Sequence, residues 1–162
     1  MKVLFDTNVL LDVVLARVPF VENAAYLLES VELEKIQGFI SATTVTDIHY
    51  LVKRHTKSAE IAIATISKLL ILMEICTVDR GVIQQAVNMG LSDFEDAVQV
   101  AAAMAKSLDA IVTRDVVDFV GSSIPIMSPD ELVKQLRACL RSFRPIRSYT
   151  KFIINYIFTR LP

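Results

Sequence analysis

Side chains that commonly hold zinc or form disulfides are scarce in this 162-residue sequence. It contains only two cysteines, Cys76 and Cys139, and two histidines, His49 and His55. Two isolated cysteines are too few for a disulfide framework or a thiolate zinc site, and two histidines are too few for a histidine metal centre. Low cysteine content and the lack of a signal sequence are typical of proteins in a reducing compartment, so we expect a cytoplasmic protein.

Long apolar runs are also missing, although 53% of the residues are hydrophobic. The longest uninterrupted runs fall well short of the ~20 residues that a membrane-spanning helix requires, so we expect no membrane association. A buried parallel sheet accounts better for the hydrophobicity. A chain of this length buries about 70% of the surface that its unfolded form exposes, which is enough for one domain with a full core.

Charge is distributed unevenly along the chain. Residues 1–140 contain 12 Lys or Arg and 18 Asp or Glu, a net charge of −6, whereas residues 141–162 contain five basic residues and no acidic one. We therefore divide the chain into a domain over residues 1–140 and a basic, aromatic C-terminal tail. An acidic domain that handles a polyanion would need metal ions, and the tail could bind single-stranded nucleic acid. We favour the alternative that residues 151–161 form an amphipathic helix packed on the domain or on a second copy.

Strand-like and helix-like segments alternate throughout residues 1–140. The predicted strands cover residues 2–5, 38–40, 74–78, 110–113 and 124–126. The predicted helices are 8–15, a helix that opens at Pro19 in the preferred first helical position, 41–55, 58–72, 79–89, 92–105 and 128–140. This alternation is typical of an α/β fold, with a parallel sheet, helices on both faces and right-handed crossovers.

Two of the predicted strands end in a carboxylate. Asp6 follows apolar residues 3–5, and Arg114-Asp115 follows residues 110–113. In open parallel sheets ligands bind just beyond the carboxyl ends of the strands, so acids at these places are directed at a crevice. The alternative for Asp6 is that it only caps the next helix, as Asp often does.

The predicted helix over residues 92–105 begins among further acids. Ser92 and Glu95 have the spacing of a capping box, which would use Glu95 at the start of the helix. Asp93 and Asp96 then share one face, three residues apart. The opposite, core-facing stripe is predicted to contain Phe94, Val98, Ala101, Ala102 and Ala105.

A doubly wound sheet can bring acids from four elements together if its first and fourth strands are neighbours. The candidates are Asp47, one turn inside the helix over residues 41–55, together with Asp6, Asp96 and Asp115. Such carboxylates could not stay ionised side by side without a cation. Oxygen ligands with no His or Cys nearby suit Mg²⁺ or Mn²⁺ and argue against zinc. Two ions about 4 Å apart could activate water and neutralise the charge that develops on a phosphate.

Four sequence blocks, in this order and spacing, resemble a known family. They are VLFDTNVLLD (3–12), SATTVTDIHYLV (41–52), LSDFEDAVQVAAA (91–103) and IVTRDVVDF (111–119). Together they are similar to PIN domains (PilT N-terminus type) over roughly residues 1–137, and most of all to the prokaryotic branch that includes VapC-like toxin ribonucleases. The resemblance implies a three-layer α/β/α fold with a parallel sheet in the strand order 3-2-1-4-5, which makes strands one and four neighbours.

The resemblance also implies roles for individual residues. Four acids match the positions of the family's metal ligands: Asp6, Asp47, Asp96 and Asp115. Four more residues match polar positions beside the ligands or are expected to act as outer-sphere helpers: Asn8, Thr113, Asp93 and Asp118. Asp47 stands where the branch usually has Glu, which is one methylene longer, so we expect Asp47 to reach a metal less directly.

The function that the resemblance implies is an endoribonuclease dependent on Mg²⁺ or Mn²⁺. Asp6, Asp96 and Asp115 would hold the principal ion, and Asp47 would assist. A VapC-like protein would also be expected to pair with a small antitoxin protein that covers the site, and to form a homodimer.

Two alternatives stay open at this point. A PIN fold whose acids no longer support turnover could bind RNA as a non-catalytic module through its basic tail. A phosphorylated receiver or a phosphohydrolase would use Asp6 as a nucleophile. Such proteins would have an acid and a lysine at the places that Asn8 and Arg114 occupy here, so we rank this alternative low.

Overall fold

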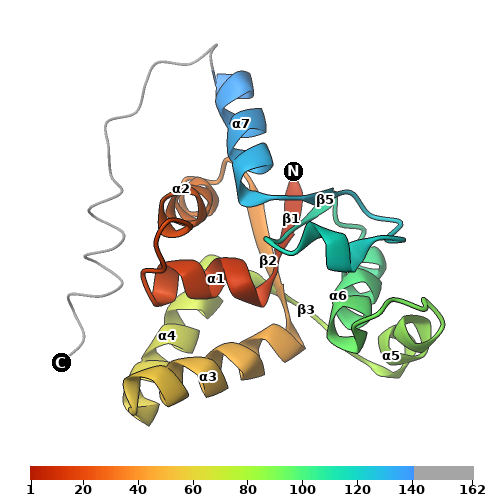
Figure 1. The fold of residues 1–162 in the computed structure, drawn as a ribbon, viewed down its shortest axis with the longest axis horizontal. Helices are drawn as coiled ribbons and strands as arrows, with labels where there is room; N and C mark the ends of the chain where they lie inside the picture. Colours follow the sequence, from red (N-terminus) through yellow and green to blue (C-terminus); the bar gives the residue numbers. More distant parts are fainter. Residues whose placement is uncertain (141–162) are drawn as a thin grey trace.

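A computed structural model describes residues 1–140, and residues 141–162, with the predicted tail helix, lie outside the described residues. The centre of the fold is a five-stranded parallel sheet in the order β3-β2-β1-β4-β5 (Figure 1). Its strands are β1 (Lys2–Phe5), β2 (Gln37–Ser41), β3 (Glu74–Cys76), β4 (Ala110–Val112) and β5 (Ile126–Met127). The predicted α/β fold and strand order are confirmed.

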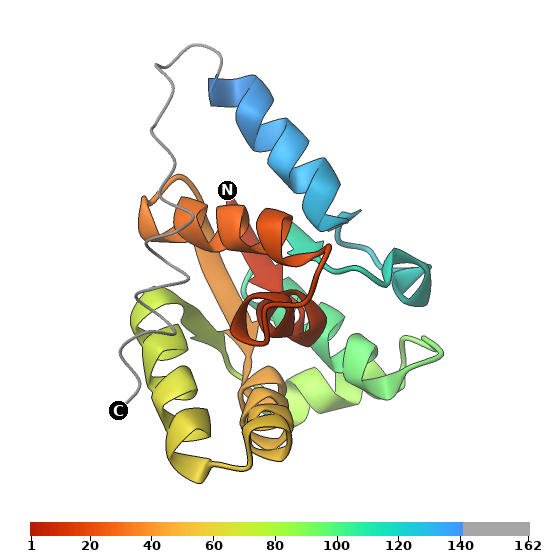
Figure 2. The same ribbon diagram turned by 60° about the vertical axis from the view of Figure 1, so that its left-hand side comes forward.

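Helices cover both faces of the sheet (Figures 1 and 2). One face packs against α1 (Thr7–Val14), α2 (Val21–Glu32), α3 (Ala42–Thr56), α4 (Ala59–Leu72) and α7 (Pro129–Leu140). The other face packs against α5 (Arg80–Val87), α6 (Phe94–Ala105) and the short 3-10 helix η1 (Val116–Phe119). Among the described residues, no helix is long and apolar enough to cross a membrane.

Alternating side chains of the central strands supply two separate cores. Val3 and Phe5 of β1 join the core beneath α1 and α2, whereas Leu4 joins the core beneath α6. Residue i and residue i+2 of a strand point to the same face, so a strand buried on both sides reads as a continuous apolar run. This is why the short apolar segments predict the strands well.

Helix starts follow the capping chemistry of the sequence at two predicted positions and depart from it at α2. The Ser41 hydroxyl accepts from the Thr44 N–H at 3.0 Å, and Ser128 and Glu131 form the predicted capping box. The predicted helix start at Pro19 is wrong, because residues 18–20 form a turn and α2 begins at Val21. The fifth strand also begins later than predicted, at Ile126, although the Pro125 carbonyl still accepts from Ile111 at 3.0 Å.

The C-terminus of α1 is closed by a Schellman motif. The Arg17 N–H donates to the Asp12 carbonyl at 2.9 Å, and the Ala16 N–H donates to the Val13 carbonyl at 3.2 Å. This geometry places Ala16 at a φ of 48°, in the left-handed region that glycine occupies more readily. The motif ties the backbone of Arg17 to the last turn of α1.

Replacement of Ala16 by glycine should stabilise the protein. Relief of the left-handed strain outweighs the extra freedom of glycine in the unfolded chain, so we expect Ala16→Gly to raise the free energy of unfolding by about 0.5–1 kcal/mol. Urea denaturation measures this change. The control is Ala64→Gly, in the middle of α4, which should lower the free energy of unfolding by about 1 kcal/mol. An Ala16→Gly protein less stable than wild type would contradict the explanation.

Candidate active site

A cavity of about 450 Å³ opens beyond the carboxyl ends of β1 and β4. Its wall contains seven carboxylate residues from five parts of the chain: Asp6, Asp47, Asp93, Glu95, Asp96, Asp115 and Asp118. All six acids predicted as ligands or helpers are among them, and Glu95 is the addition. Of the lining residues that the structure describes, Arg17 alone is basic.

Asp6 is the most deeply buried acid of this wall, with 6% of its surface exposed. It stands at the N-cap position of α1, but its side chain makes no capping hydrogen bond. Instead its Oδ1 accepts from Gln99 Nε2 at 3.0 Å and its Oδ2 accepts from Thr113 Oγ1 at 2.7 Å. Burial raises the pKa of Asp6 above its usual value, although both hydrogen bonds oppose that rise. The geometry therefore goes against a capping role for Asp6.

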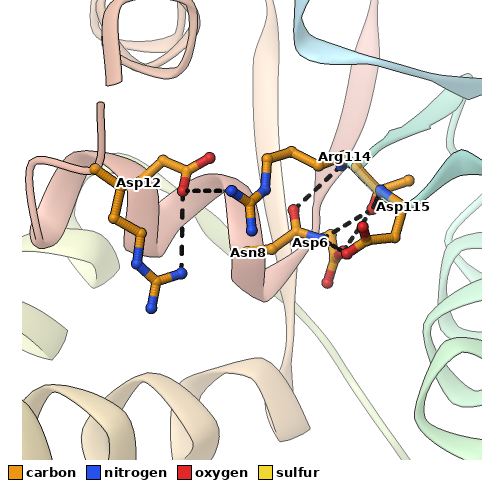
Figure 3. Close-up of polar contacts among 7 residues, drawn as sticks. Asp6, Asn8, Asp12, Arg114 and Asp115 are labelled. Atoms are coloured by element: carbon orange, nitrogen blue, oxygen red, sulfur yellow. Dashed lines mark hydrogen bonds and ion pairs between the residues drawn. The ribbon is translucent and has the colours of Figure 1, made fainter. Parts of the chain in front are cut away.

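Hydrogen bonds of Asn8 and Thr113 join the ends of β1 and β4, and Figure 3 shows Asn8 beside Asp115. Asn8 Nδ2 donates to Thr113 Oγ1 at 3.1 Å and to Asp115 Oδ2 at 2.8 Å. The Asp115 N–H donates to Thr113 Oγ1 at 3.0 Å, and the Arg114 N–H donates to Asn8 Oδ1 at 3.3 Å. These bonds orient the Asp115 carboxylate.

Gln99 is a polar residue of the site that the sequence analysis missed. It is 1% exposed and donates to Asp6, while its own Oε1 is buried without a hydrogen-bond partner among the described residues. Gln99 lies three residues after Asp96 on α6, so the helical period places both side chains on one face. The three-residue spacing from Asp96 is the sequence signal that could have identified Gln99.

The start of α6 differs from the predicted capping box. Asp93, and not Ser92, is the N-cap, and its Oδ1 accepts from the N–H groups of Glu95 at 2.7 Å and Asp96 at 3.4 Å. Because the N-cap lies one residue later than predicted, the Glu95 side chain is not used in a cap and lines the cavity. Phe94, predicted to face the core, is 53% exposed.

Two acids at the start of α6 have pKa values near neutrality. Burial raises the pKa of Asp96 to about 7, with repulsion from Asp6, Asp93, Asp118 and Asp115 adding to the shift. Burial also raises the pKa of Glu95 to about 7, with further contributions from the charge of Asp47 and a hydrogen bond to the Asp47 carboxyl group. The site therefore holds more negative charge than it can stabilise by itself.

The donor set fits a hard divalent cation in its chemistry. The carboxylate oxygens of the wall are of the kind that Mg²⁺ and Mn²⁺ prefer. Gln99 Oε1, buried behind this wall and without a hydrogen-bond partner among the described residues, is another oxygen of this kind. A cation would also relieve the repulsion that raises the pKa of Asp96. Within residues 1–140, no three Asp, Glu, His or Cys side chains are already grouped as a metal-ligand set. The acids would therefore have to close around an ion.

A family model for the PIN domain matches residues 2–117. The chain belongs to the PIN-domain family. The resemblance inferred from the four sequence blocks is thereby confirmed. Membership also removes the receiver alternative, whose doubly wound sheet has the strand order 2-1-3-4-5 and not the order found here.

Solved structures of other PIN-like proteins share the fold. A chain of the FitAcB structure from Neisseria gonorrhoeae is 24% identical, with a TM-score of 0.61 over 78% of this chain and 97% of that one. A chain of the structure of VapBC2 from Rickettsia felis, bound to a promoter DNA fragment, is 14% identical, with a TM-score of 0.60 over 79% of this chain and 98% of that one. PAE2754 from Pyrobaculum aerophilum is 18% identical, with a TM-score of 0.60 over 85% of this chain and 90% of that one. No curated protein matches significantly.

The metal-free PIN domain should lose stability as the pH rises from about 4 to about 7. Over this interval the folded protein retains protons on Asp96 and Glu95, whose pKa values are about 7 against ordinary values of 3.8 and 4.5. Because the unfolded chain has already released these protons, raising the pH favours unfolding. Since both groups are partly exposed, we expect the melting temperature in EDTA to fall by a few degrees between pH 5 and pH 8.

Asp96→Asn provides the control for this pH dependence. All other titrating groups are shared with wild type. The variant removes one carboxyl group whose pKa is raised by folding, so its melting temperature should vary less with pH. Equal pH profiles for the two proteins would contradict the assignment.

Proposed function

We propose that this PIN-domain protein is an endoribonuclease that depends on Mg²⁺ or Mn²⁺. The observation that carries the proposal is the convergence of acids from β1, α3, α6 and the end of β4 on one cavity, where burial and mutual repulsion raise the pKa of Asp96. A site of this kind favours cation binding and is unsuited to a polyanionic substrate without it.

In this proposal Asp6, Asp96 and Asp115 hold the principal ion. Bound divalent ions supply a Lewis acid for the phosphate and lower the pKa of water. Thr113 and Gln99 orient the two oxygens of Asp6, and Asn8 orients Asp115. The remaining helpers, Asp93 and Asp118, lie on the cavity wall, where they can accept hydrogen bonds from water around the ion.

Glu95 extends the ligand set that the sequence suggested. Asp47 is one methylene shorter than the usual Glu, and the Glu95 carboxyl group lines the same cavity, close enough to Asp47 for that residue to raise the pKa of Glu95. We propose that the two carboxyl groups act as a pair, in which the longer Glu95 side chain contacts the metal ion that the shorter Asp47 side chain reaches less directly.

The proposed biological setting is a toxin paired with a small antitoxin protein. Similar structures include FitAcB, VapBC2 and a toxin-antitoxin complex from Klebsiella pneumoniae. These relatives support an antitoxin partner for this chain. The RNA substrate, the homodimer and the cytoplasmic location stay predictions.

Replacement of Asp96 by Asn should abolish metal-dependent cleavage. We expect a loss of about 100-fold or more, because the variant removes a charge needed to hold the ion at the reacting phosphate. The assay uses labelled RNAs and single-stranded DNAs with Mn²⁺, Mg²⁺ or EDTA. Asp130→Asn, which changes an exposed acid on α7, should cleave like wild type.

The same assay distinguishes the nuclease from the RNA-binding alternative. If folded wild type cleaves no RNA in Mn²⁺ or Mg²⁺ but binds RNA in EDTA, the catalytic proposal is wrong. Loss of that binding when residues 141–162 are removed would then favour the non-catalytic module.

The paired action of Glu95 and Asp47 should appear as non-additive kinetics. Glu95→Gln and Asp47→Asn should each lower the cleavage rate by about 10–100-fold and raise the Mn²⁺ concentration needed for half-maximal rate. Because both changes disrupt one pair, the cleavage rate of the double variant should be only slightly lower than that of the slower single variant. Additive losses, or a Glu95→Gln protein with unchanged Mn²⁺ dependence, would contradict the pairing.

A further inference from the structure

The wall of the acidic cavity contains a positively charged side chain that has no role in the proposed chemistry. Arg17 lies on the cavity wall with 38% of its side chain exposed. It follows α1, whereas the acids at the strand ends lie at the beginning of that helix. A substrate that carries negative charge along its length could contact Arg17 while it lies in the cavity.

The position of Arg17 is set by a buried carboxylate outside the acidic wall. Asp12 of α1 is fully buried, and its Oδ1 lies 3.3 Å from Arg114 Nη1 (Figure 3). The same oxygen lies 4.0 Å from Arg17 Nη1. One carboxylate therefore faces two guanidinium groups. This cluster carries one surplus positive charge, which its buried partner cannot neutralise.

The two arginines of this cluster differ in what they can still bind. Arg114 has the closer contact with Asp12, stacks its guanidinium 4.3 Å from the centre of the Phe20 ring and does not line the cavity. Arg17 has the longer contact and lines the cavity, and among the described residues Asp12 is the one side chain in contact with its five N–H donors. The surplus charge is thus presented to the cavity by Arg17.

The backbone also fixes Arg17 before any ligand arrives. The Arg17 N–H donates to the Asp12 carbonyl, and the Arg17 carbonyl accepts from the Val21 N–H, each at 2.9 Å. These bonds join the end of α1 to the start of α2. They fix the backbone position from which the Arg17 side chain extends to the cavity wall.

We propose that Arg17 binds a phosphate of the RNA strand that neighbours the phosphate being cleaved. The proposal rests on the proposed nuclease function and adds a substrate contact to it. The backbone of Arg17 lies beyond the eight residues of α1, about 12 Å of helix, from that of Asp6, so we assign its guanidinium to the neighbouring phosphate and not to the phosphate at Asp6 and Asp115. A guanidinium fork matches two phosphate oxygens, which a point charge does not.

RNA binding measured without cleavage tests the contact. A labelled single-stranded RNA is titrated in Ca²⁺ at several KCl concentrations with wild type, Arg17→Gln and Arg17→Lys. We expect Arg17→Gln to raise the Kd about tenfold and to reduce the slope of log K against log salt by about 0.7, the value for one phosphate contact on a single strand. Arg17→Lys should keep the slope and bind with intermediate affinity.

Arg80→Gln serves as the matched control, because Arg80 is exposed and lies outside the cavity wall. It should leave both the Kd and the salt slope unchanged. A purely structural role for Arg17 would lower the melting temperature without changing the salt slope. A salt slope and a Kd equal to those of wild type in Arg17→Gln would overturn the proposal.

Cleavage kinetics in Mn²⁺ supply an independent readout. Arg17→Gln should raise KM about tenfold and leave kcat within about twofold, because the contact is made equally in the ground state and the transition state. A fall in kcat with an unchanged KM would overturn the assignment to a neighbouring phosphate. If wild type binds RNA in Ca²⁺ but cleaves none in Mn²⁺ or Mg²⁺, the nuclease proposal fails while the binding comparison still decides the role of Arg17. If wild type binds no RNA, the Arg17 proposal fails as well.

Discussion

The parallel pairing of β1 with β4 is the constraint on which the candidate site depends. Leu4 pairs with Ile111, and the Asp6 N–H donates to the Val112 carbonyl at 3.0 Å, so two chain segments more than 100 residues apart end at the same edge. The sheet holds these ends rigidly because both strands are buried on both faces. Asn8, at the start of α1, then bonds to Thr113, directly after β4, so that Asp6 and Asp115 are kept together despite their repulsion.

That repulsion is a cost that the metal-free fold carries. Burial raises the pKa of Asp6, Glu95 and Asp96, which means that their ionised forms are less stable here than in water. The backbone and core enforce the arrangement, and a divalent cation would convert the unfavourable charge into ligand binding. Functional sites commonly depart in this way from the arrangement that would be best for stability alone.

The cluster of Asp12, Arg17 and Arg114 places net positive charge next to the acidic wall of the cavity. Arg114 follows Thr113 directly in the chain, so the segment that carries Asp115 also contacts the buried Asp12 at the far end of α1 (Figure 3). The Schellman motif of α1 brings Arg17 to the same carboxylate. Positive charge thus lies on the same cavity wall as the acids, where under our proposal Arg17 contacts a polyanionic substrate.

Short-range chemistry in the sequence determined the strands, most helices and the acids at the strand ends. Apolar runs mark buried strands, and Ser41 and Ser128 mark helix starts, because these signals act within a few residues. The block resemblance also supplied the strand order that makes Asp6 and Asp115 neighbours. The same local logic failed at α6, where Ser92 and Asp93 are both good caps and differ by one position.

Only the tertiary structure decided between those caps, and with them whether Glu95 serves a helix end or the cavity. It also decided the partners of Gln99 and Asp12, which lie 93 and 102 positions away at Asp6 and Arg114. Local propensities carry no information on such contacts. They arise when the sheet and its helices pack, because burial then selects which polar side chains must meet.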